Sequence, residues 1–397
     1  MIPPDEALRI VLDHTPRLEA VEVPLIDAVG ACLAEPVAGD LDLPPFDKSA
    51  MDGYAVRAGD VAETPAELAV VEELPAGVVP TKAVGPGQCA KITTGAPVPA
   101  GADMVVMVED TERAGEGRVR ILAAHPDRRN ICRRGEDIRE GQTVLDAGHV
   151  VRAAEVGLLA SVGRDRVRIH RRPRVAILGT GDELVPITET PGPGQIRDSN
   201  SWSLTACCRR AGVEVERLGV AKDTEADLRE KIGGGLACDV LLVSGGVSMG
   251  EWDLVPKVFD EFGVTVHFAA VRMKPGKPTV FATAENGIIF GLPGNPVSTL
   301  VAWRLFVWPA LRKMMGHRDP APPPVQGTLT AALKARGNRT TFLPVRLNQK
   351  DGAWTIEPVT SHGSADMVSF ARADALVILE PGTYEAGATV HALPLEL

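Results

Sequence analysis

The sequence lacks the excess of basic residues that a general nucleic-acid binder normally presents. Its 42 Lys and Arg residues stand against 52 Asp and Glu residues, which gives a formal net charge of −10 at pH 7. This balance argues against nucleic acid as a partner. A small anionic ligand stays open, because one basic pocket can lie on an acidic protein.

Paired cysteines, a leader segment and long apolar runs are also missing. None of the six cysteines forms a Cys-X-X-Cys pair, and Cys207 and Cys208 are adjacent, which suits neither a zinc site nor an ordinary disulfide framework. The first residues lack the basic and apolar parts of a signal peptide, and apolar runs such as residues 240–243 are too short to cross a membrane. We therefore expect a cytoplasmic protein with reduced thiols and no membrane segment.

The length and the rhythm of apolar residues predict several domains. A chain of 397 residues is too long for one compact core. Residues 4–14 and Ala153 to Val162 fit helices, the second one stopped by Gly163, whereas residues 44–136 consist of short strand-like runs such as Leu68 to Val71 and Met104 to Val108. The second region therefore looks inserted into the first.

From Pro173 onward, continuous apolar strands alternate with helices, a pattern typical of a parallel sheet covered on both faces. The expected strands are Val175 to Leu178, Val213 to Leu218, Asp239 to Val243 and Gly287 to Leu292. The expected helices are Trp202 to Ala211, Asp223 to Ile232, Lys257 to Phe262 and Val297 to Met315. After a proline-rich linker, the strand-like runs Phe342 to Leu347 and Ala375 to Leu379 predict a small barrel or sandwich.

The loop from Ser244 to Asp253 follows a buried strand, and ligands of open parallel sheets bind at such strand ends. Gly245 and Gly246 let backbone N–H groups point into one concavity, and Ser248 adds a hydroxyl donor. The Asp253 carboxylate suits a divalent cation held against a phosphate. The loop therefore predicts a phosphate- and cation-binding site; the alternative is a surface turn whose aspartate caps the next helix.

Three further loops support an anion site. Residues 179–184 repeat the glycine and carboxylate design with Glu183, although this residue could merely begin a helix. In residues 293–298, from Pro293 to Ser298, Asn295 as N-cap and Pro296 as first helical residue predict a helix start, and the glycine just before them leaves room for an anion at the helix N-terminus. Lys274 and Lys277 are held between prolines, which favours anion recognition over a solvated lysine pair.

The inserted region adds hydroxyl and charged residues in three strings: residues 48–55 with Asp52, residues 92–97 with Thr93, and residues 133–137 with two arginines and Asp137. Each string alone is typical of a turn.

Taken in order, these strings resemble the molybdopterin molybdenumtransferase family, the enzymes that insert molybdenum into molybdopterin, which is related to the C-terminal part of gephyrin. The matching segments are Ser49 to Ala55, Thr93 to Pro97, Arg133 to Asp137, Gly179 to Leu184, Ser244 to Asp253, Lys274 to Pro278, Gly291 to Ser298, and His362 to Ser364.

The resemblance implies four domains. They are an elongated helical linker domain (residues 1–43 and 137–169), an inserted β domain (44–136), a three-layer molybdopterin-binding α/β domain (170–318) and a small C-terminal β-barrel (319–397). It also implies a homodimer whose active site lies between the third domain of one subunit and the second domain of the other.

The implied reaction starts from adenylylated molybdopterin and molybdate, requires Mg²⁺ and releases AMP. The implied roles fall into three sets. Catalytic residues are Asp52, Asp137, Glu183, Asp223 and Asp253, with Glu183 and Asp253 also as metal ligands. The molybdopterin and its phosphate are bound by Thr93, Gly245, Gly246, Ser248, Pro293, Asn295 and Pro296. Molybdate is held by Lys274, Lys277, Ser298, Arg339 and Ser364. An upstream adenylyltransferase and downstream cofactor-maturation proteins are the implied protein partners.

Two other functions stay open at this point. One is an adenylyltransferase or nucleotide pyrophosphatase on the same α/β domain, which residues 44–136 argue against. The other is a non-catalytic scaffold, which the intact acidic and lysine loops argue against.

Overall fold

The computed structural model describes residues 1–125, 127, 129–246, 254–350 and 352–395. Contacts divide the chain into two units, of which the first comprises Met1–Ala34, Gly148–Arg152 and Val167–Leu397. The second unit comprises Glu35–Ala147 and Ala153–Arg166. The sequence-based division into four domains is not the same partition and stays a prediction. No helix within the described ranges combines the length and the apolar character needed to span a bilayer.

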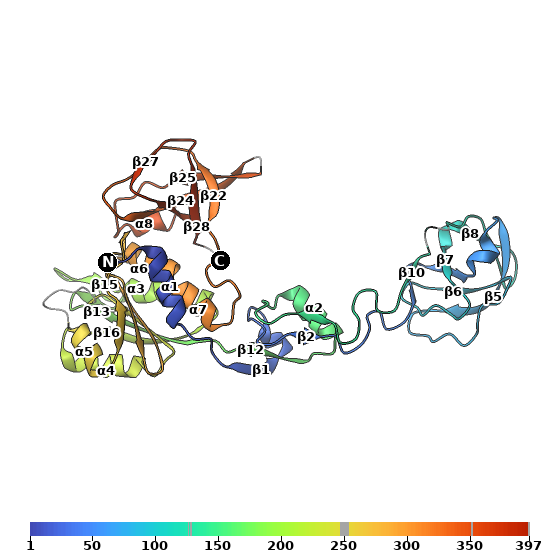
Figure 1. Ribbon diagram of the computed structural model, residues 1–397, viewed down its shortest axis with the longest axis horizontal. Helices are drawn as coiled ribbons and strands as arrows, with labels where there is room; N and C mark the ends of the chain where they lie inside the picture. Colours follow the sequence, from blue (N-terminus) through green and yellow to red (C-terminus); the bar gives the residue numbers. More distant parts are fainter. Residues whose placement is uncertain (126, 128, 247–253, 351, 396–397) are drawn as a thin grey trace. The chain divides into compact units, whose positions relative to one another are not determined.

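The first unit is built around a six-stranded sheet in the order β16-β13-β17-β21-β20-β18; Figure 1 labels β13 and β16 of this sheet. Its strands are β13 (Arg174–Thr180), β16 (Glu214–Ala221), β17 (Val240–Ser244), β18 (Thr265–Phe268), β20 (Val280–Ala284) and β21 (Gly287–Leu292). The first four in this order run parallel, as predicted. The two remaining strands were not predicted: β20 pairs antiparallel with both β21 and β18, so the sheet is mixed rather than wholly parallel. The two residues between β20 and β21 permit a hairpin but no crossover.

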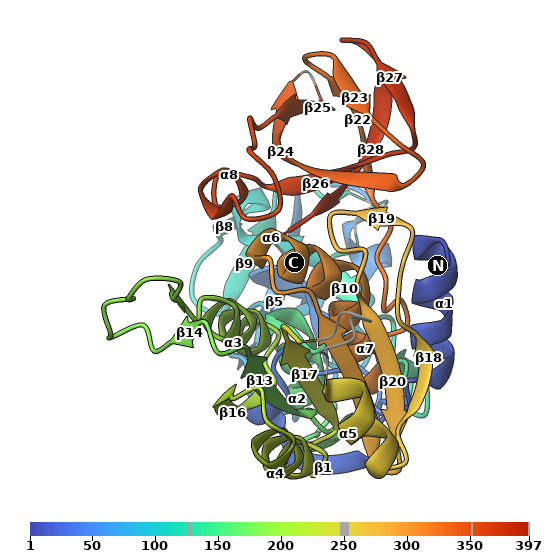
Figure 2. The same ribbon diagram turned by 90° about the vertical axis from the view of Figure 1, so that its left-hand side faces the viewer.

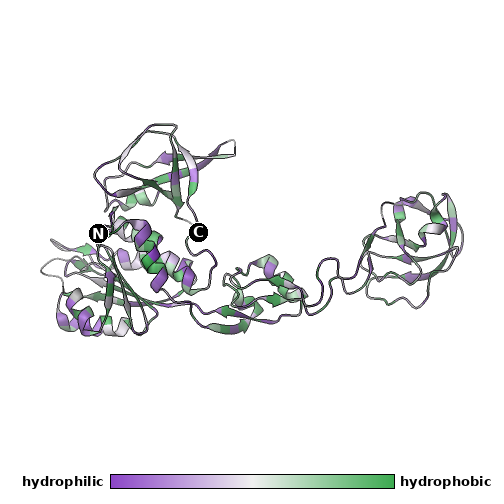
Figure 3. Cartoon of the chain, viewed as in Figure 1, coloured by the Kyte–Doolittle hydropathy of each residue, from purple (hydrophilic) through white to green (hydrophobic). Residues whose placement is uncertain are grey.

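Helices cover both faces of this sheet and give three layers (Figure 2). They are α1 (Pro4–His14), α3 (Asn200–Arg210), α4 (Glu225–Gly235), α5 (Val255–Glu261), α6 (Pro296–Ala302), η4 (Trp303–Val307) and α7 (Trp308–Met314). Successive residues of a strand point to opposite faces. Val175 and Ile177 accordingly pack in the core that includes α1, α3, α6 and α7, whereas Ala176 and Leu178 pack in the core of α4 and α5. Figure 3 shows the sheet strands as largely hydrophobic and the helices as two-sided.

The helical segment predicted for residues 297–315 exists, but its middle turn, η4, is π-helical. A regular α-helix would need the N–H of Pro309 to bind the carbonyl group of Leu305, and proline has no such N–H and crowds that carbonyl. The wider π-helical turn includes Leu305, whose carbonyl group would meet the proline ring in a regular α-helix. It carries Arg304 in the middle of an apolar run.

The C-terminal part of the first unit is a closed barrel, which confirms the barrel prediction. Its strands are β22 (Val325–Leu329), β24 (Thr340–Lys350), β25 (Ala353–Pro358), β26 (Ala375–Leu379) and β28 (Thr389–Pro394). They follow the order β24-β25-β22-β28-β26, and an additional β24–β26 pairing closes the ring. The flanking elements are α8 (Met367–Phe370) and the pair β23 (Leu333–Ala335) and β27 (Gly382–Tyr384). Strand β19 (Met273–Lys274), from the α/β part, joins the barrel beside β24.

Smaller elements complete the first unit: β1 (Ala20–Pro24), the 3-10 turn η1 (Leu25–Ala28), β12 (Arg166–His170, without its first residue, which belongs to the second unit), β14 (Leu184–Val185) and β15 (Ile196–Arg197). Strand β1 pairs with β12, and β14 pairs with β15.

The second unit is mainly β, as predicted. Its six-stranded sheet, in the order β7-β4-β6-β5-β9-β8, consists of β4 (Gly53–Val56), β5 (Ala66–Leu74), β6 (Gln88–Ile92), β7 (Met104–Met107), β8 (Thr111–Arg113) and β9 (Arg118–Ile121). The short elements are β2 (Val37–Ala38), β3 (Lys48–Ser49), η2 (Ala58–Val61), η3 (Val108–Asp110), β10 (Ile131–Cys132), β11 (Thr143–Leu145) and α2 (Ala153–Ser161). Gly163, the predicted stop of α2, has the positive φ of +74° that favours glycine after a helix.

Candidate functional site

The parallel strands β13, β17 and β21 end at the same edge of the sheet. Residue pairing sets Gly179 beside Ser244, and Ser244 beside Leu292, so the loops that follow these strands meet. They line a cavity of about 470 Å³, here called the strand-end cavity. Its walls include Thr180, Glu183, Asp198, Ser199, Asn200, Ser244, Gly245, Gly294, Asn295 and Pro296.

The two predicted glycines of the loop after β17 pack against the loop after β13. A Cβ atom on Gly245 would lie 2.5 Å from the carbonyl oxygen of Thr180, and one on Gly246 would lie 2.4 Å from Thr180 Oγ1. Both glycines also have positive φ, at +89° and +57°. Glycine is therefore required here for a close approach between loops, and Gly245 itself lines the cavity. Ser248 and Asp253 lie outside the described residues.

Asn200, which the sequence analysis did not single out, connects the loops that follow β17 and β21. Its Nδ2 atom donates hydrogen bonds to Ser244 Oγ at 2.9 Å and to the carbonyl oxygen of Gly294 at 2.8 Å. Its Oδ1 atom and Thr180 Oγ1 are buried without a hydrogen-bond partner within the described part of the chain. Buried polar atoms are normally paired, so this wall offers unused hydrogen-bonding capacity to a ligand. The string Asp198-Ser199-Asn200 between a strand and a helix was the available signal.

Glu183 lies in an acidic corner beside Asp182 and Asp223. The backbone N–H of Asp223 donates to Asp182 Oδ1 at 3.2 Å, and the Glu183 carboxyl group lies against Gly181. Burial raises the pKa of Asp223, and the charges of Asp182 and Glu183 raise it further. Glu183 lines the strand-end cavity, whereas Asp223 is not among its lining residues. Within the described ranges, no three Asp, Glu, His or Cys side chains are placed to hold a metal ion.

A second cavity, also of about 470 Å³ and here called the lysine cavity, lies between the sheet and the barrel. All five residues predicted to hold an oxyanion line it: Lys274, Lys277, Ser298, Arg339 and Ser364. Pro293 lines it too, and Gly294 and Asn295 belong to both cavities, so the cavities are neighbours. None of the described residues in its wall is acidic.

Backbone contacts fix the groups of the lysine cavity. The N–H of Val297 donates to the carbonyl oxygen of Ser364 at 3.0 Å, and Arg339 Nη1 donates to that of Met273 at 3.4 Å. Asn295 occupies the predicted N-cap position and Pro296 the first turn of α6, but the Asn295 side chain makes no capping hydrogen bond. Thr299 Oγ1 instead donates to the carbonyl oxygen of Pro293 at 2.6 Å and secures the turn.

The remaining predicted residues lie in the second unit. Asp52 Oδ1 accepts hydrogen bonds from the backbone N–H of Thr94 at 2.6 Å and from its hydroxyl group at 2.8 Å. These two bonds lower the pKa of Asp52. Thr93 Oγ1 accepts from the N–H of Ala76 at 2.9 Å, and the N–H of Asp137 donates to the carbonyl oxygen of Leu43 at 3.0 Å.

Both arginines of the string at residues 133–137 are already paired. Arg133 contacts Asp47 at 2.5 Å, and Arg134 contacts Asp42 at 2.7 Å. These two ion pairs hold residues 133–137 against the loop that contains Asp42 and Asp47.

The fold and the two cavities define a class: an α/β domain with cavities lined by polar and basic residues at the carboxyl edge of its sheet, followed by a small barrel. Three family models match the chain: the MoeA N-terminal region (domain I and II) at residues 2–163, the probable molybdopterin binding domain at 176–313, and the MoeA C-terminal region (domain IV) at 326–395.

Individual relatives cover nearly the whole chain. The molybdopterin molybdenumtransferase of Nostoc sp. is 37% identical over 99% of this chain and 93% of its own length. That of Bacillus subtilis is 35% identical over 99% and 94%. The crystal structure of the molybdopterin biosynthesis MoeA protein of Pyrococcus horikoshii is 31% identical, covers 100% of both chains and has a TM-score of 0.83. The chain belongs to the molybdopterin molybdenumtransferase family.

Proposed function

We propose that the chain transfers molybdenum from molybdate to adenylylated molybdopterin and releases AMP, the last step in making the molybdenum cofactor. The observation that carries the proposal is the lysine cavity, which gathers Lys274, Lys277 and Arg339 with the hydroxyl groups of Ser298 and Ser364. A tetrahedral dianion needs several cations and hydroxyl donors around it, and no carboxylate among the described lining residues opposes it.

The strand-end cavity is the proposed site of the pterin and its phosphate. Gly245, Asn295 and Pro296 line it, and Gly246 and Pro293 lie beside it; with Ser248 they form the proposed binding set. Because the two cavities share Gly294 and Asn295, a dithiolene in one would lie next to an oxyanion in the other. This proximity lets the enzyme hold both reactants in one orientation, a large part of catalysis for two bound substrates.

The acidic corner supports a divalent cation, which we propose to be Mg²⁺. The pKa of Asp223 is raised by burial and by the charges of Asp182 and Glu183, a repulsion that a divalent cation would relieve. Glu183 would hold the ion together with Asp253, which lies outside the described residues. When bound, the ion supplies positive charge to the phosphoanhydride as AMP leaves.

We further propose a cytoplasmic homodimer in which Asp52, Thr93 and Asp137 act on the partner subunit's cavities. The two hydrogen bonds from Thr94 support this role for Asp52, because they hold its carboxyl group ionised and fixed in direction. An adenylyltransferase would supply the substrate, and cofactor-maturation proteins would receive the product. Matches to both the MoeA N-terminal and C-terminal regions support the transferase over enzymes built on the α/β domain alone.

The test is an assay with purified protein, Mg²⁺, adenylylated molybdopterin and molybdate. We expect AMP and molybdenum cofactor to appear in equal amounts. Absence of both products from folded, dimeric protein would refute the proposed reaction. AMP release without cofactor would instead indicate a pyrophosphatase.

A further inference from the structure

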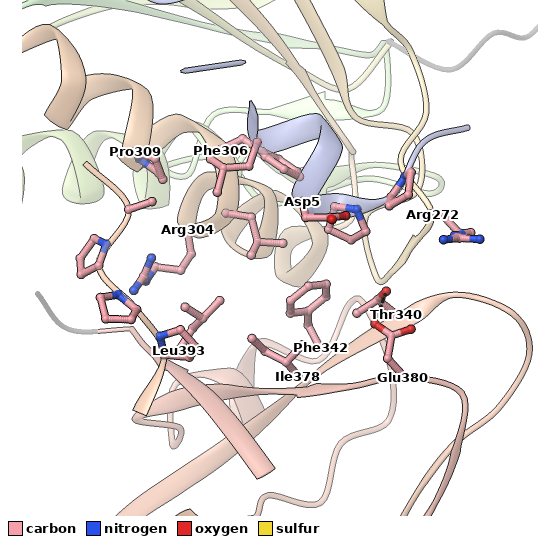
Figure 4. A pocket seen from close by; sticks show the side chains of 18 residues that line it. Asp5, Arg272, Arg304, Phe306, Pro309, Thr340, Phe342, Ile378, Glu380 and Leu393 are labelled. Atoms are coloured by element: carbon pink, nitrogen blue, oxygen red, sulfur yellow. Dashed lines mark hydrogen bonds between the residues drawn. The ribbon is translucent and has the colours of Figure 1, made fainter. Parts of the chain in front are cut away.

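A third cavity, of about 620 Å³ and here called the arginine cavity, lies between the helices and the barrel (Figure 4). Its wall is mainly apolar and comes mostly from α1, η4, the start of α7, the proline linker and the barrel. Phe306, Phe342, Ile378 and Leu393 are among its lining residues. It contains none of the residues assigned to the transferase reaction.

Arg304 is the unusual member of this wall. It lies in the π-helical turn and is 4% exposed, so its charge is almost fully removed from bulk water. Within the described part of the chain its guanidinium group makes one hydrogen bond, from Nε to the carbonyl oxygen of Pro394 at 2.6 Å. Its two terminal nitrogens have no protein partner there, and Figure 4 shows the guanidinium group turned into the cavity.

No carboxylate compensates the charge of Arg304 within the described ranges. The neighbouring charge is Arg312, which repels it, and burial together with Arg312 lowers the pKa of Arg304 to about 10. Arg304 therefore stays protonated at neutral pH. A buried, unpaired cation is costly, and a protein normally neutralises such a group with a counter-ion.

The remaining polar residues of the cavity lie at its other end. Figure 4 shows Asp5, Arg272, Thr340 and Glu380 there, with Phe342 and Ile378 between them and Arg304. Glu380 is held by Thr340, whose Oγ1 donates to Glu380 Oε1 at 2.8 Å. Two acids and one arginine leave this end with net negative charge, which disfavours a ligand that is anionic at both ends.

We propose that the arginine cavity binds a small organic anion with one carboxylate group on an apolar body. The carboxylate group accepts hydrogen bonds from the two terminal nitrogens of Arg304, a planar fork that matches carboxylate geometry. The apolar body lies on Phe342 and Ile378. Inorganic oxyanions fit poorly, because they would leave the apolar wall without contact.

Isothermal titration calorimetry on the full-length protein without substrate tests this site, with 4-phenylbutyrate as the probe and its neutral amide as the shape-matched comparison. We expect the acid to bind at least about tenfold more tightly than the amide, because a hydrogen bond to a charged group adds roughly that much. Equal affinity for acid and amide, or no binding of the acid, would overturn the proposal.

Three variants localise the binding. Arg304→Met should abolish the preference for the acid. Arg346→Met is the matched control, because Arg346 also donates through Nε to a backbone carbonyl, that of Arg372, but is exposed; it should retain the preference. Ile378→Trp fills the cavity without touching the charge and should weaken acid and amide alike, with an unchanged circular dichroism spectrum as the check on folding. Wild-type affinity in the Arg304→Met and Ile378→Trp variants would place the probe elsewhere and refute the site. The titration contains no molybdopterin, so it stands apart from the transferase assay.

Discussion

The lysine cavity and the arginine cavity both border the barrel, and Phe342 lines both. The lysine cavity presents exposed cations, Lys274 and Lys277, on a loop that water reaches. The arginine cavity presents one buried cation among apolar side chains. The difference teaches how surroundings select an anion: several hydrated charges suit a compact dianion, and one desolvated charge suits a monoanion with an apolar body.

The largest effect is expected when one lysine of the lysine cavity is removed. Lys277→Ala should raise the molybdate concentration for half-maximal activity by about 10- to 100-fold, because one charged hydrogen bond contributes roughly 1.5–3 kcal/mol. Steady-state AMP release at varied molybdate measures the change. Lys334→Ala, an exposed lysine of β23, is the control and should leave the value unchanged. If Lys277→Ala left the half-maximal molybdate concentration unchanged, Lys277 would not contribute to molybdate binding.

A stability measurement sharpens the contrast further. Arg304→Met should raise the free energy of unfolding by about 1 kcal/mol, since removing a buried uncompensated charge outweighs the loss of one hydrogen bond. Lys277→Ala should change it by less than about 0.5 kcal/mol, as for most surface positions. Urea unfolding followed by tryptophan fluorescence gives both values. Destabilisation of the Arg304→Met variant by several kcal/mol would mean that the arginine is a structural requirement of the fold.

The smallest expected effect concerns negative charge in the acidic corner. The pKa of Asp223 is raised in the folded chain, so its contribution to stability is complete below the ordinary aspartate pKa of about 3.9 and is lost as pH rises through the raised value. Asp223→Asn, which stays neutral, should therefore melt with the wild type at low pH and at a higher temperature at pH 7.

The same melting experiment tests the cation. Added Mg²⁺ should raise the melting temperature of the wild type more than that of Asp223→Asn. Asp260→Asn, at an exposed position of α5, is the control. Identical melting of wild type and Asp223→Asn across the pH range would contradict the proposed charge conflict.

The sequence predicted those parts of the site whose signals are local. Lys274, Lys277 and Asn295 follow or precede strands in strings rich in proline and glycine, and strand-end geometry then brings the loops together. Arg339 and Ser364 came from the family resemblance, because their approach depends on how the barrel packs.

The features that the sequence did not predict depend on tertiary structure. The reversed direction of β20 depends on a turn of two residues, which the spacing of apolar residues does not reveal. Arg304 looks like an ordinary helical arginine in the sequence. Its burial arises from a π-turn and from contact with Pro394, 90 positions away.

Strand β19 connects the α/β part to the barrel and restricts how these two parts can move. It places Met273 beside Thr340 and Lys274 beside Thr341 of the barrel, and the N–H of Thr340 donates to the carbonyl oxygen of Arg272 at 3.2 Å. The loop that carries Lys274 and Lys277 is therefore joined by main-chain hydrogen bonds to the part of the barrel that carries Arg339. Any hinge motion that opened the lysine cavity would first have to break these main-chain hydrogen bonds. The rate of amide hydrogen exchange at Thr340 would therefore report how often the cavity opens.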